Sequence, residues 1–115
     1  MDRSHFNREV IRVFGRIVDV IDEEDPDVVE AERTGDILKL IFADGVQFIL
    51  NTQSATHQIW LAGAARGWHF DFKGDVEKWV CAKSGDELFE TLQGMVEEKL
   101  GRNKTYLFRK YKITQ

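Results

Sequence analysis

The stretch DILKLIFADGVQFILN, residues 36–51, places two short apolar runs on either side of a turn. Asp44-Gly45 accepts the positive φ angles of a tight hairpin turn, so the stretch predicts two paired antiparallel strands. Successive side chains of a strand point to opposite faces. Alternation therefore places one apolar set on a common inner face: Leu38, Leu40, Phe42, Val46, Phe48 and Leu50. The opposite face receives a mixed set: Gln47, Ile49 and Asn51.

Further strands are expected on both sides of this hairpin. One precedes it, near residues 27–33. Three short runs rich in aromatic and β-branched residues follow it, separated by turns that contain glycine. These runs are HQIWLA (57–62), GWHFDF (67–72) and EKWVCA (77–82). The pattern predicts about six strands in a meander.

An amphipathic helix is expected before the strands, from Ser4 to about Glu24. Its apolar residues recur at intervals of three and four, which marks one helical face: Phe6, Val10, Phe14, Ile17 and Ile21. Pro26 disfavours helical geometry at Asp25, so the helix should end within the acidic run around it.

A second helix is expected in SGDELFETLQGMVEEKLG, residues 84–101. Ser84 with Glu87 three residues later has the spacing of a capping box, and Gly101 is a plausible C-terminal stop. One apolar stripe follows the cap: Leu88, Leu92, Val96 and Leu100. The order helix, strands, helix predicts an α+β fold, a two-layer sandwich with both helices on one face of an antiparallel sheet. The other face of the sheet should be open to solvent.

The length and composition of the chain suit one domain, because it has 115 residues and is 43% hydrophobic. No apolar run approaches the roughly 20 residues that span a bilayer, and the first ten residues lack the apolar core of a secretion signal. The chain is therefore expected to be intracellular. Its single cysteine, Cys81, excludes an internal disulfide and is expected to be a small buried apolar residue.

Charge is segregated along the chain. Residues 19–32, DVIDEEDPDVVEAE, hold eight acids and no lysine or arginine within a chain of net charge −4. The segment after Gly101, RNKTYLFRKYKITQ (102–115), carries five bases and no acid. The basic segment therefore balances much of the charge of the acidic segment.

Trp60 is the most unusual residue of the strand pattern. Alternation turns Ile59 and Leu61 inward, so Gln58 and Trp60 fall on the uncovered face of the sheet. An exposed tryptophan with amide neighbours has the composition of a protein-binding hot spot. The alternative is that the register differs by one residue and that Trp60 lies in the core.

NTQSATHQIWLA (51–62), followed by GWHFDF, EKWVCAKSGDELFETL and an acidic first helix, resembles the frataxin family in its bacterial form over about residues 4–101. The resemblance implies two helices on one antiparallel sheet and weak binding of ferrous and ferric iron. It also implies binding to the cysteine desulfurase and scaffold of the iron-sulfur cluster machinery. Carried over by position, the acidic ridge of the family falls on Asp19, Asp22, Glu23, Asp25, Glu30 and Glu32. The family's sheet-surface signature falls on Asn51, Gln53, Gln58 and Trp60.

The sequence departs from this resemblance in two places. Val18 and Val28 stand where bacterial relatives often have acids, and three arginines lie on the first helix, so the ridge is thinner here. The basic extension, residues 102–115, is longer than the bacterial pattern. We expect residues 1–101 to form the frataxin-like domain and the extension to pack on it, as a C-terminal extension does in eukaryotic frataxins.

The ridge offers only carboxylates to a metal ion. Asp19, Asp22 and Glu23 have i, i+3 and i+4 spacing, so they share one helical face and could share a largely hydrated ion. Such sites would be weak and exchangeable, and the alternative is a solvated acidic face without metal. His57 and His69 are further candidate ligands, although isolated strand histidines are more often structural or at the surface.

The sequence therefore predicts an iron-binding protein that regulates iron-sulfur cluster assembly. The main alternative is ferroxidase or iron-storage activity on the ridge. No nucleotide-binding or hydrolase motif is present, and single-stranded nucleic-acid binding by KTYLFRKYK (104–112) is disfavoured by the overall acidity. The protein is expected to be a monomer that can assemble under iron load. Its expected location is the cytoplasm if bacterial, or the mitochondrial matrix if it is a processed eukaryotic form.

Overall fold

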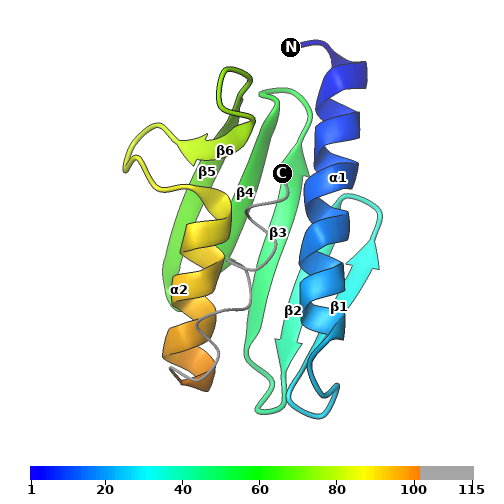
Figure 1. Cartoon of the computed structure of the whole chain (residues 1–115), viewed down its shortest axis with the longest axis vertical. Coiled ribbons are helices and arrows are strands. Elements are labelled where there is room, and N and C mark those ends of the chain that lie inside the picture. Colours follow the sequence, from blue (N-terminus) through cyan, green and yellow to red (C-terminus); the bar gives the residue numbers. More distant parts are fainter. Residues whose placement is uncertain (102–115) are drawn as a thin grey trace.

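The structure, a computed structural model, describes residues 1–101. Two helices pack on one face of a six-stranded antiparallel sheet (Figure 1). The strands follow one another across the sheet in chain order, each paired with the next. The elements are α1 Arg3–Asp22, β1 Val29–Thr34, β2 Ile37–Phe42, β3 Gln47–Gln53, β4 Gln58–Gly63, β5 Arg66–Lys73, β6 Lys78–Cys81 and α2 Leu88–Leu100. The predicted α+β sandwich and meander are confirmed. The basic extension lies outside the described residues, so its packing stays a prediction.

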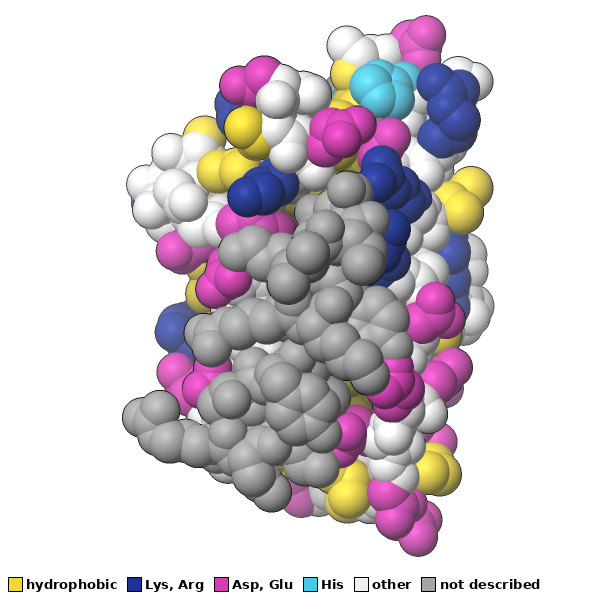
Figure 2. Space-filling model, in the orientation of Figure 1, with side chains coloured by type: hydrophobic (Ala, Val, Ile, Leu, Met, Phe, Trp, Pro, Cys, Tyr) yellow, Lys and Arg dark blue, Asp and Glu magenta, His cyan; other side chains and the backbone are white. Residues whose placement is uncertain are grey.

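Helix α1 begins after Asp2, whose carboxylate accepts a hydrogen bond from the backbone N–H of His5 at 2.8 Å. This bond holds the pKa of Asp2 below its ordinary value. The buried face of α1 contains every predicted apolar residue and two more: Phe6, Val10, Val13, Phe14, Ile17, Val20 and Ile21. On the exposed side, basic residues gather over the N-terminal half of α1 and acidic residues over its C-terminal half (Figure 2).

The β2–β3 hairpin forms as predicted, with Leu40 opposite Phe48 and Leu38 opposite Leu50. Val46 lies opposite Phe42, whose N–H donates to the Val46 carbonyl, but it is 39% exposed and does not join the core. Gly45 has a φ of 89° and donates its N–H to the carbonyl of Phe42, so the turn contains three residues, 43–45. Val46 is next to this turn, one residue before β3 begins.

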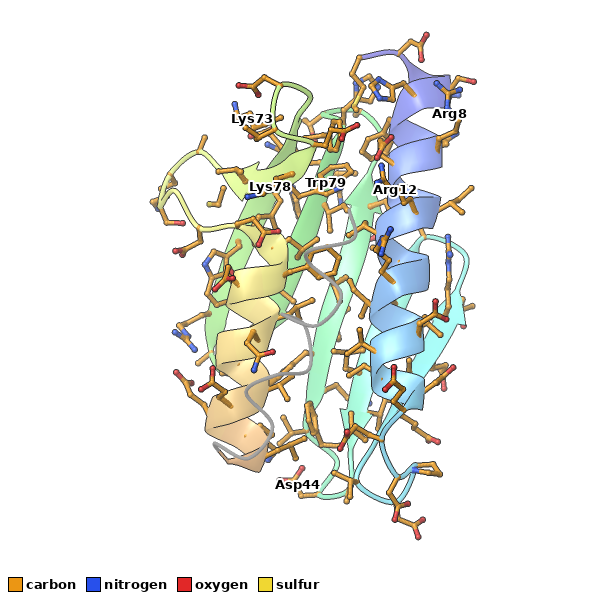
Figure 3. The ribbon with its side chains drawn as sticks, in the orientation of Figure 1. Arg8, Arg12, Asp44, Lys73, Lys78 and Trp79 are labelled. Atoms are coloured by element: carbon orange, nitrogen blue, oxygen red, sulfur yellow. The ribbon has the colours of Figure 1, made fainter. Side chains whose placement is uncertain are left out.

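This turn is tied to the end of α2 by an ion pair between Lys99 and Asp44. Figure 3 labels Asp44 below the end of α2. The hydrogen bond from Lys99, together with that from the backbone N–H of Val46, lowers the pKa of Asp44. The side chain of Lys99 also lies 5.8 Å above the ring of Phe42. The hairpin turn and α2 are therefore joined by charge at the edge of the core.

Helix α2 begins three residues later than the capping-box pattern predicts. Glu87, and not Ser84, is the N-cap, and its carboxylate accepts from the backbone N–H groups of Phe89 and Glu90, each at 3.0 Å. The chain first turns back on β6 through Gly85, which has a φ of 79°, and the N–H of Cys81 donates to Asp86. Residues 84–87 are held in this turn and cannot open the helix.

The rest of α2 agrees with the prediction. Leu88, Leu92 and Val96 are buried, Leu100 is partly buried, and Gly101 caps the helix with a φ of 100°. Cys81 is buried in the same core, as expected. Within residues 1–101, neither helix is long and apolar enough to cross a lipid bilayer.

Gly63, at the end of β4, is the described glycine whose Cβ position lies closest to neighbouring side chains. A Cβ at this position would lie 2.6 Å from Cδ1 of Phe48 and 2.7 Å from Cε of Met95. Because the Phe48 ring is buried, we expect Gly63→Ala to destabilise the protein by about 1 kcal/mol through overpacking. Urea unfolding measures the change.

The control for this prediction is Gly94→Ala in α2. A Cβ at Gly94 would meet no described atom within 4 Å. The variant should stabilise the helix by up to about 1 kcal/mol, since alanine is the better helix former. Equal stability of the Gly63 variant and the parent would contradict the close packing at β4.

Candidate functional site

The open face of the sheet presents the predicted tryptophan. Trp60 is 36% exposed, while its neighbours Ile59 and Leu61 are fully buried. The β3–β4 register places Asn51 opposite Trp60 and Gln53 opposite Gln58, so the four signature residues share this face. The orientation predicted from alternation is confirmed, and the alternative with Trp60 in the core is wrong.

Hydrogen bonds hold the indole ring of Trp60 in place. Its Nε1–H donates to Oε1 of Gln58 at 2.9 Å, and Nε2 of Gln58 donates to Oδ1 of Asp71 at 3.1 Å. The Thr56 hydroxyl also donates to Oε1 of Gln58, at 3.3 Å. Gln58 therefore links β4 to β5 and fixes the tryptophan from one side.

His69 fixes the same ring from β5. It lies opposite Trp60 in the β4–β5 register, and the two rings stack with centroids 4.0 Å apart and planes 6° apart. Sequence reasoning weighed His69 as a metal ligand against a structural or surface residue and did not identify its stacking on Trp60. The cross-strand register was the signal that could have found it, because the turn between β4 and β5 is short. His57 instead stacks on Phe6, at 5.1 Å between centroids.

A shallow pocket of about 280 Å³ adjoins Trp60 on the open face. It is mostly apolar and lies beside the ring of Trp60, where β3, β4 and β5 are neighbours in the sheet. The lining residues are Ile49, Asn51, Trp60, Leu61, Ala62, Gly67, Trp68 and His69. Because Gly67 has no side chain, the floor of the pocket stays open beside the ring. A partner's apolar side chain could enter here while the amides of β3 and β4 bind polar groups around it.

The structure divides the predicted acidic ridge between two places. Asp19 and Asp22 are exposed on the last turn of α1, and Glu23 is its C-cap residue. Asp25 follows in the loop, where its carboxylate accepts from the N–H of Asp27 at 2.9 Å. Four of the six predicted carboxylates therefore lie around the C-terminal end of α1.

The other two lie on the edge strand. Glu30 pairs with Ile41 and Glu32 with Lys39, on the side of the sheet that faces away from the helices. These acids therefore share the open face with Trp60. Among residues 1–101, no three His, Cys, Asp or Glu side chains are gathered closely enough to hold a metal ion. The ridge is a spread of separate carboxylates and could offer an ion only partial, hydrated coordination.

Comparison with known proteins explains this combination of fold and surface. The family model of the frataxin-like domain matches residues 1–102, nearly nine-tenths of the chain. The chain belongs to the frataxin family. The match ends where the basic extension begins, so most of that extension lies beyond the family domain.

Solved frataxins agree with this assignment. The frataxin of Psychromonas ingrahamii, a model for stability within the CyaY protein family, is 29% identical with a TM-score of 0.78, over 87% of this chain and 92% of that one. Trimeric frataxin from Saccharomyces cerevisiae with its full-length N-terminus is 25% identical with a TM-score of 0.66, over 78% of this chain and 77% of that one. The yeast trimer complexed with ferrous iron has the same identity and TM-score, over 78% and 83%.

Proposed function

We propose that this frataxin binds iron weakly and regulates iron-sulfur cluster assembly by docking on the cysteine desulfurase and its scaffold. Docking uses Asn51, Gln53, Gln58 and Trp60, and iron binds along Asp19, Asp22, Glu23, Asp25, Glu30 and Glu32. The observation that carries the proposal is the exposed indole of Trp60, fixed by Gln58 and His69 beside an apolar pocket. For a bacterial source, this role places the protein in the cytoplasm.

The rigidity of Trp60 supports a binding role over a structural one. A surface tryptophan that served only the fold would not need two neighbours to hold its ring in the open. A fixed ring loses little conformational freedom on binding, so more of its contact energy appears as affinity. The stacked His69 and the bound Gln58 therefore prepare the surface for a partner.

The chemistry of the ridge supports iron as a transient cargo. Carboxylate oxygens suit hard cations, whereas tight and selective iron sites usually add imidazole or thiolate ligands. His57 in the β3–β4 turn and His69 in β5 are both engaged in ring stacking, and Cys81 is buried. Iron held by separated exposed carboxylates exchanges readily, as delivery or sensing requires.

We expect iron and the partner to compete for part of this surface. Glu30 and Glu32 lie three strands from Trp60 on one face, roughly 14 Å at about 4.8 Å per strand, so a partner large enough to cover Trp60 also approaches them. A basic partner patch would be attracted to these acids, and this attraction is screened over about 8 Å at physiological ionic strength. Docking should therefore weaken steeply with added salt and with ferrous iron. Titrations of the desulfurase complex, under anaerobic conditions, measure both effects.

The variant Glu30→Gln with Glu32→Gln is the matched test of this competition. It should dock with less salt dependence and lose most of the effect of iron. The control Glu97→Gln with Glu98→Gln removes the same charge from α2 and should behave as the parent. Affinity that ignores both salt and iron would contradict a shared electrostatic surface.

The alternative, ferroxidase activity on the ridge, is favoured by one feature, the i, i+3 spacing of Asp19 and Asp22 on an exposed helical turn. Two iron ions a few ångströms apart would be required. Oxygen consumption on adding ferrous iron, lost in Asp19→Asn with Asp22→Asn, would support this activity. No consumption above that of buffer would exclude it.

A further inference from the structure

The charges at the C-terminal end of α1 run against its dipole. The N-terminal end of a helix favours acids and the C-terminal end favours bases. The N-cap residue Asp2 agrees with this rule, whereas the last turn contains Asp19 and Asp22 and no base. In a single copy of the protein, the position of these two acids is unfavourable.

The outer face of α1 carries Arg8 and Asp22 in one row. Positions spaced alternately by four and three residues stay on one side of a helix. The row, which we call the outer face of α1, consists of Ser4, Arg8, Ile11, Gly15, Val18 and Asp22. Val18 lies at its edge, where it also packs against the core. Ile11 is 60% exposed, the largest exposure among the large hydrophobic side chains in residues 1–101.

Gly15, at the centre of this row, has no function within the described chain. Glycine in the middle of a helix is less favourable than alanine. A Cβ at Gly15 would meet no described atom within 4 Å, so nothing in residues 1–101 requires its absence. The absence of a side chain at Gly15 leaves room for another backbone to approach α1 here.

We propose that the outer face of α1 is the contact surface of a symmetric dimer, in which α1 packs antiparallel on α1 of a second copy at Gly15. Arg8 and Asp22 each lie seven residues from Gly15, a distance of about 10.5 Å along the helix. A two-fold axis through the glycines therefore brings Arg8 of each copy beside Asp22 of the other. Ile11 meets Val18 of the second copy between these pairs.

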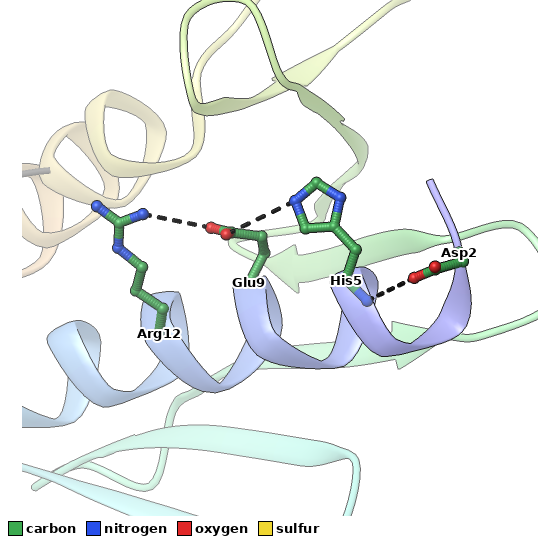
Figure 4. A network of polar contacts seen from close by, with 4 residues as sticks. All are labelled: Asp2, His5, Glu9 and Arg12. Carbon is green, nitrogen blue, oxygen red and sulfur yellow. Dashed lines mark hydrogen bonds and ion pairs between the residues drawn. The ribbon is translucent and has the colours of Figure 1, made fainter.

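The row fits a second copy better than an unrelated partner. An isologous contact needs a surface that is complementary to itself under two-fold rotation. The outer face has a base and an acid at equal distances from a small central residue, which is this pattern. Figure 3 shows Arg8 on the side of α1 away from α2. Arg12 is different, since it pairs with Glu9 in its own chain at 3.5 Å (Figure 4).

The charged side chains of α1 that this contact uses have no ion-pair partner in their own described chain. Within residues 1–101, Arg8, Asp19 and Asp22 form no ion pair. In the dimer, Asp22 gains a cation at the negative end of its helix, and Arg8 gains an anion. The contact therefore relieves the unfavourable interaction of Asp22 with the helix dipole.

Sedimentation equilibrium of the full chain tests the proposal, from micromolar to millimolar concentration and with chelator present so that metal bridges are absent. We expect a dimer that weakens at high salt. Arg8→Glu and Asp22→Arg should each raise the dimer dissociation constant about tenfold or more, because each reverses two ion pairs per dimer. An equimolar mixture of the two variants should associate as the parent does, since both contacts are matched again.

Control variants separate this contact from net charge. Lys73→Glu and Asp75→Arg make the same charge changes away from α1 and should leave the dimer unchanged. Gly15→Ala should raise the melting temperature and still weaken association. Circular dichroism confirms that each variant is folded. A parent that is monomeric at millimolar concentration, or a mixture of Arg8→Glu and Asp22→Arg that associates no better than either variant alone, would overturn the proposal.

Discussion

Replacing Trp60 by alanine is expected to leave the fold intact and to weaken docking on the desulfurase or scaffold by about 2 kcal/mol or more. Trp60 lies on the open face, and its side chain contributes nothing to the core beneath β4, where Ile59 and Leu61 are buried. Its loss removes the aromatic anchor and one wall of the adjoining pocket. The measurements are titration calorimetry with the partner and the melting temperature of the free variant.

Trp79→Ala is the matched control for this prediction. Trp79 is 3% exposed and packs on Phe6 and Phe72, with ring centroids 5.9 Å and 5.3 Å away. Its truncation should cost about 3 to 5 kcal/mol of stability, as for other buried aromatic residues. Trp60→Ala should thus lower affinity for the partner, and Trp79→Ala should lower the stability of the fold. A large fall in melting temperature for Trp60→Ala, with unchanged affinity for the partner, would show that this residue belongs to the fold and not to the site.

The face of Trp60 could be predicted because strand alternation is a local property. Ile59 and Leu61 fix the orientation of β4 without knowledge of the neighbouring strands. The errors arose where a distant contact overrode a local signal. Ser84 has the spacing of an N-cap, but Gly85 and the pairing of residues 86–87 with β6 delay the helix. Val46 continues the alternation opposite Phe42, but it lies next to the hairpin turn and is exposed there.

In the candidate site, too, local features could be predicted from the sequence and contacts between distant residues could not. The four signature residues follow from alternation and family resemblance, whereas the roles of His69 and Asp71 depend on which residues face each other across β4 and β5. The ridge was predicted as one group because its residues were carried over together from the family resemblance. The structure separates the end of α1 from the open face of β1, since Glu30 and Glu32 point away from the helices. Proximity in sequence did not decide which carboxylates share a surface.

The acids at the end of α1 should lower the free energy of unfolding of the free protein. Asp19 and Asp22 lie in the last turn, where the helix dipole is already negative, and they are at like-charge spacing. Each misplaced acid should cost about 0.3 to 1 kcal/mol and the pair about 0.2 to 0.5 kcal/mol at low salt. We therefore expect Asp19→Lys with Asp22→Lys to raise the free energy of unfolding by about 1 to 2 kcal/mol.

The same substitutions should abolish the response to metal. A cation that binds only the folded state stabilises it in proportion to its occupancy, so divalent cation should raise the melting temperature of the parent and scarcely move that of the variant. Thermal melts at low ionic strength and low protein concentration, with and without cation, measure both effects. Asp36→Lys with Asp75→Lys makes the same change of net charge in exposed turns and should not gain the helix-end stability. If the α1 variant is less stable than the parent, or gains as much from cation, these acids are neither strained by the helix dipole nor part of a metal-binding surface.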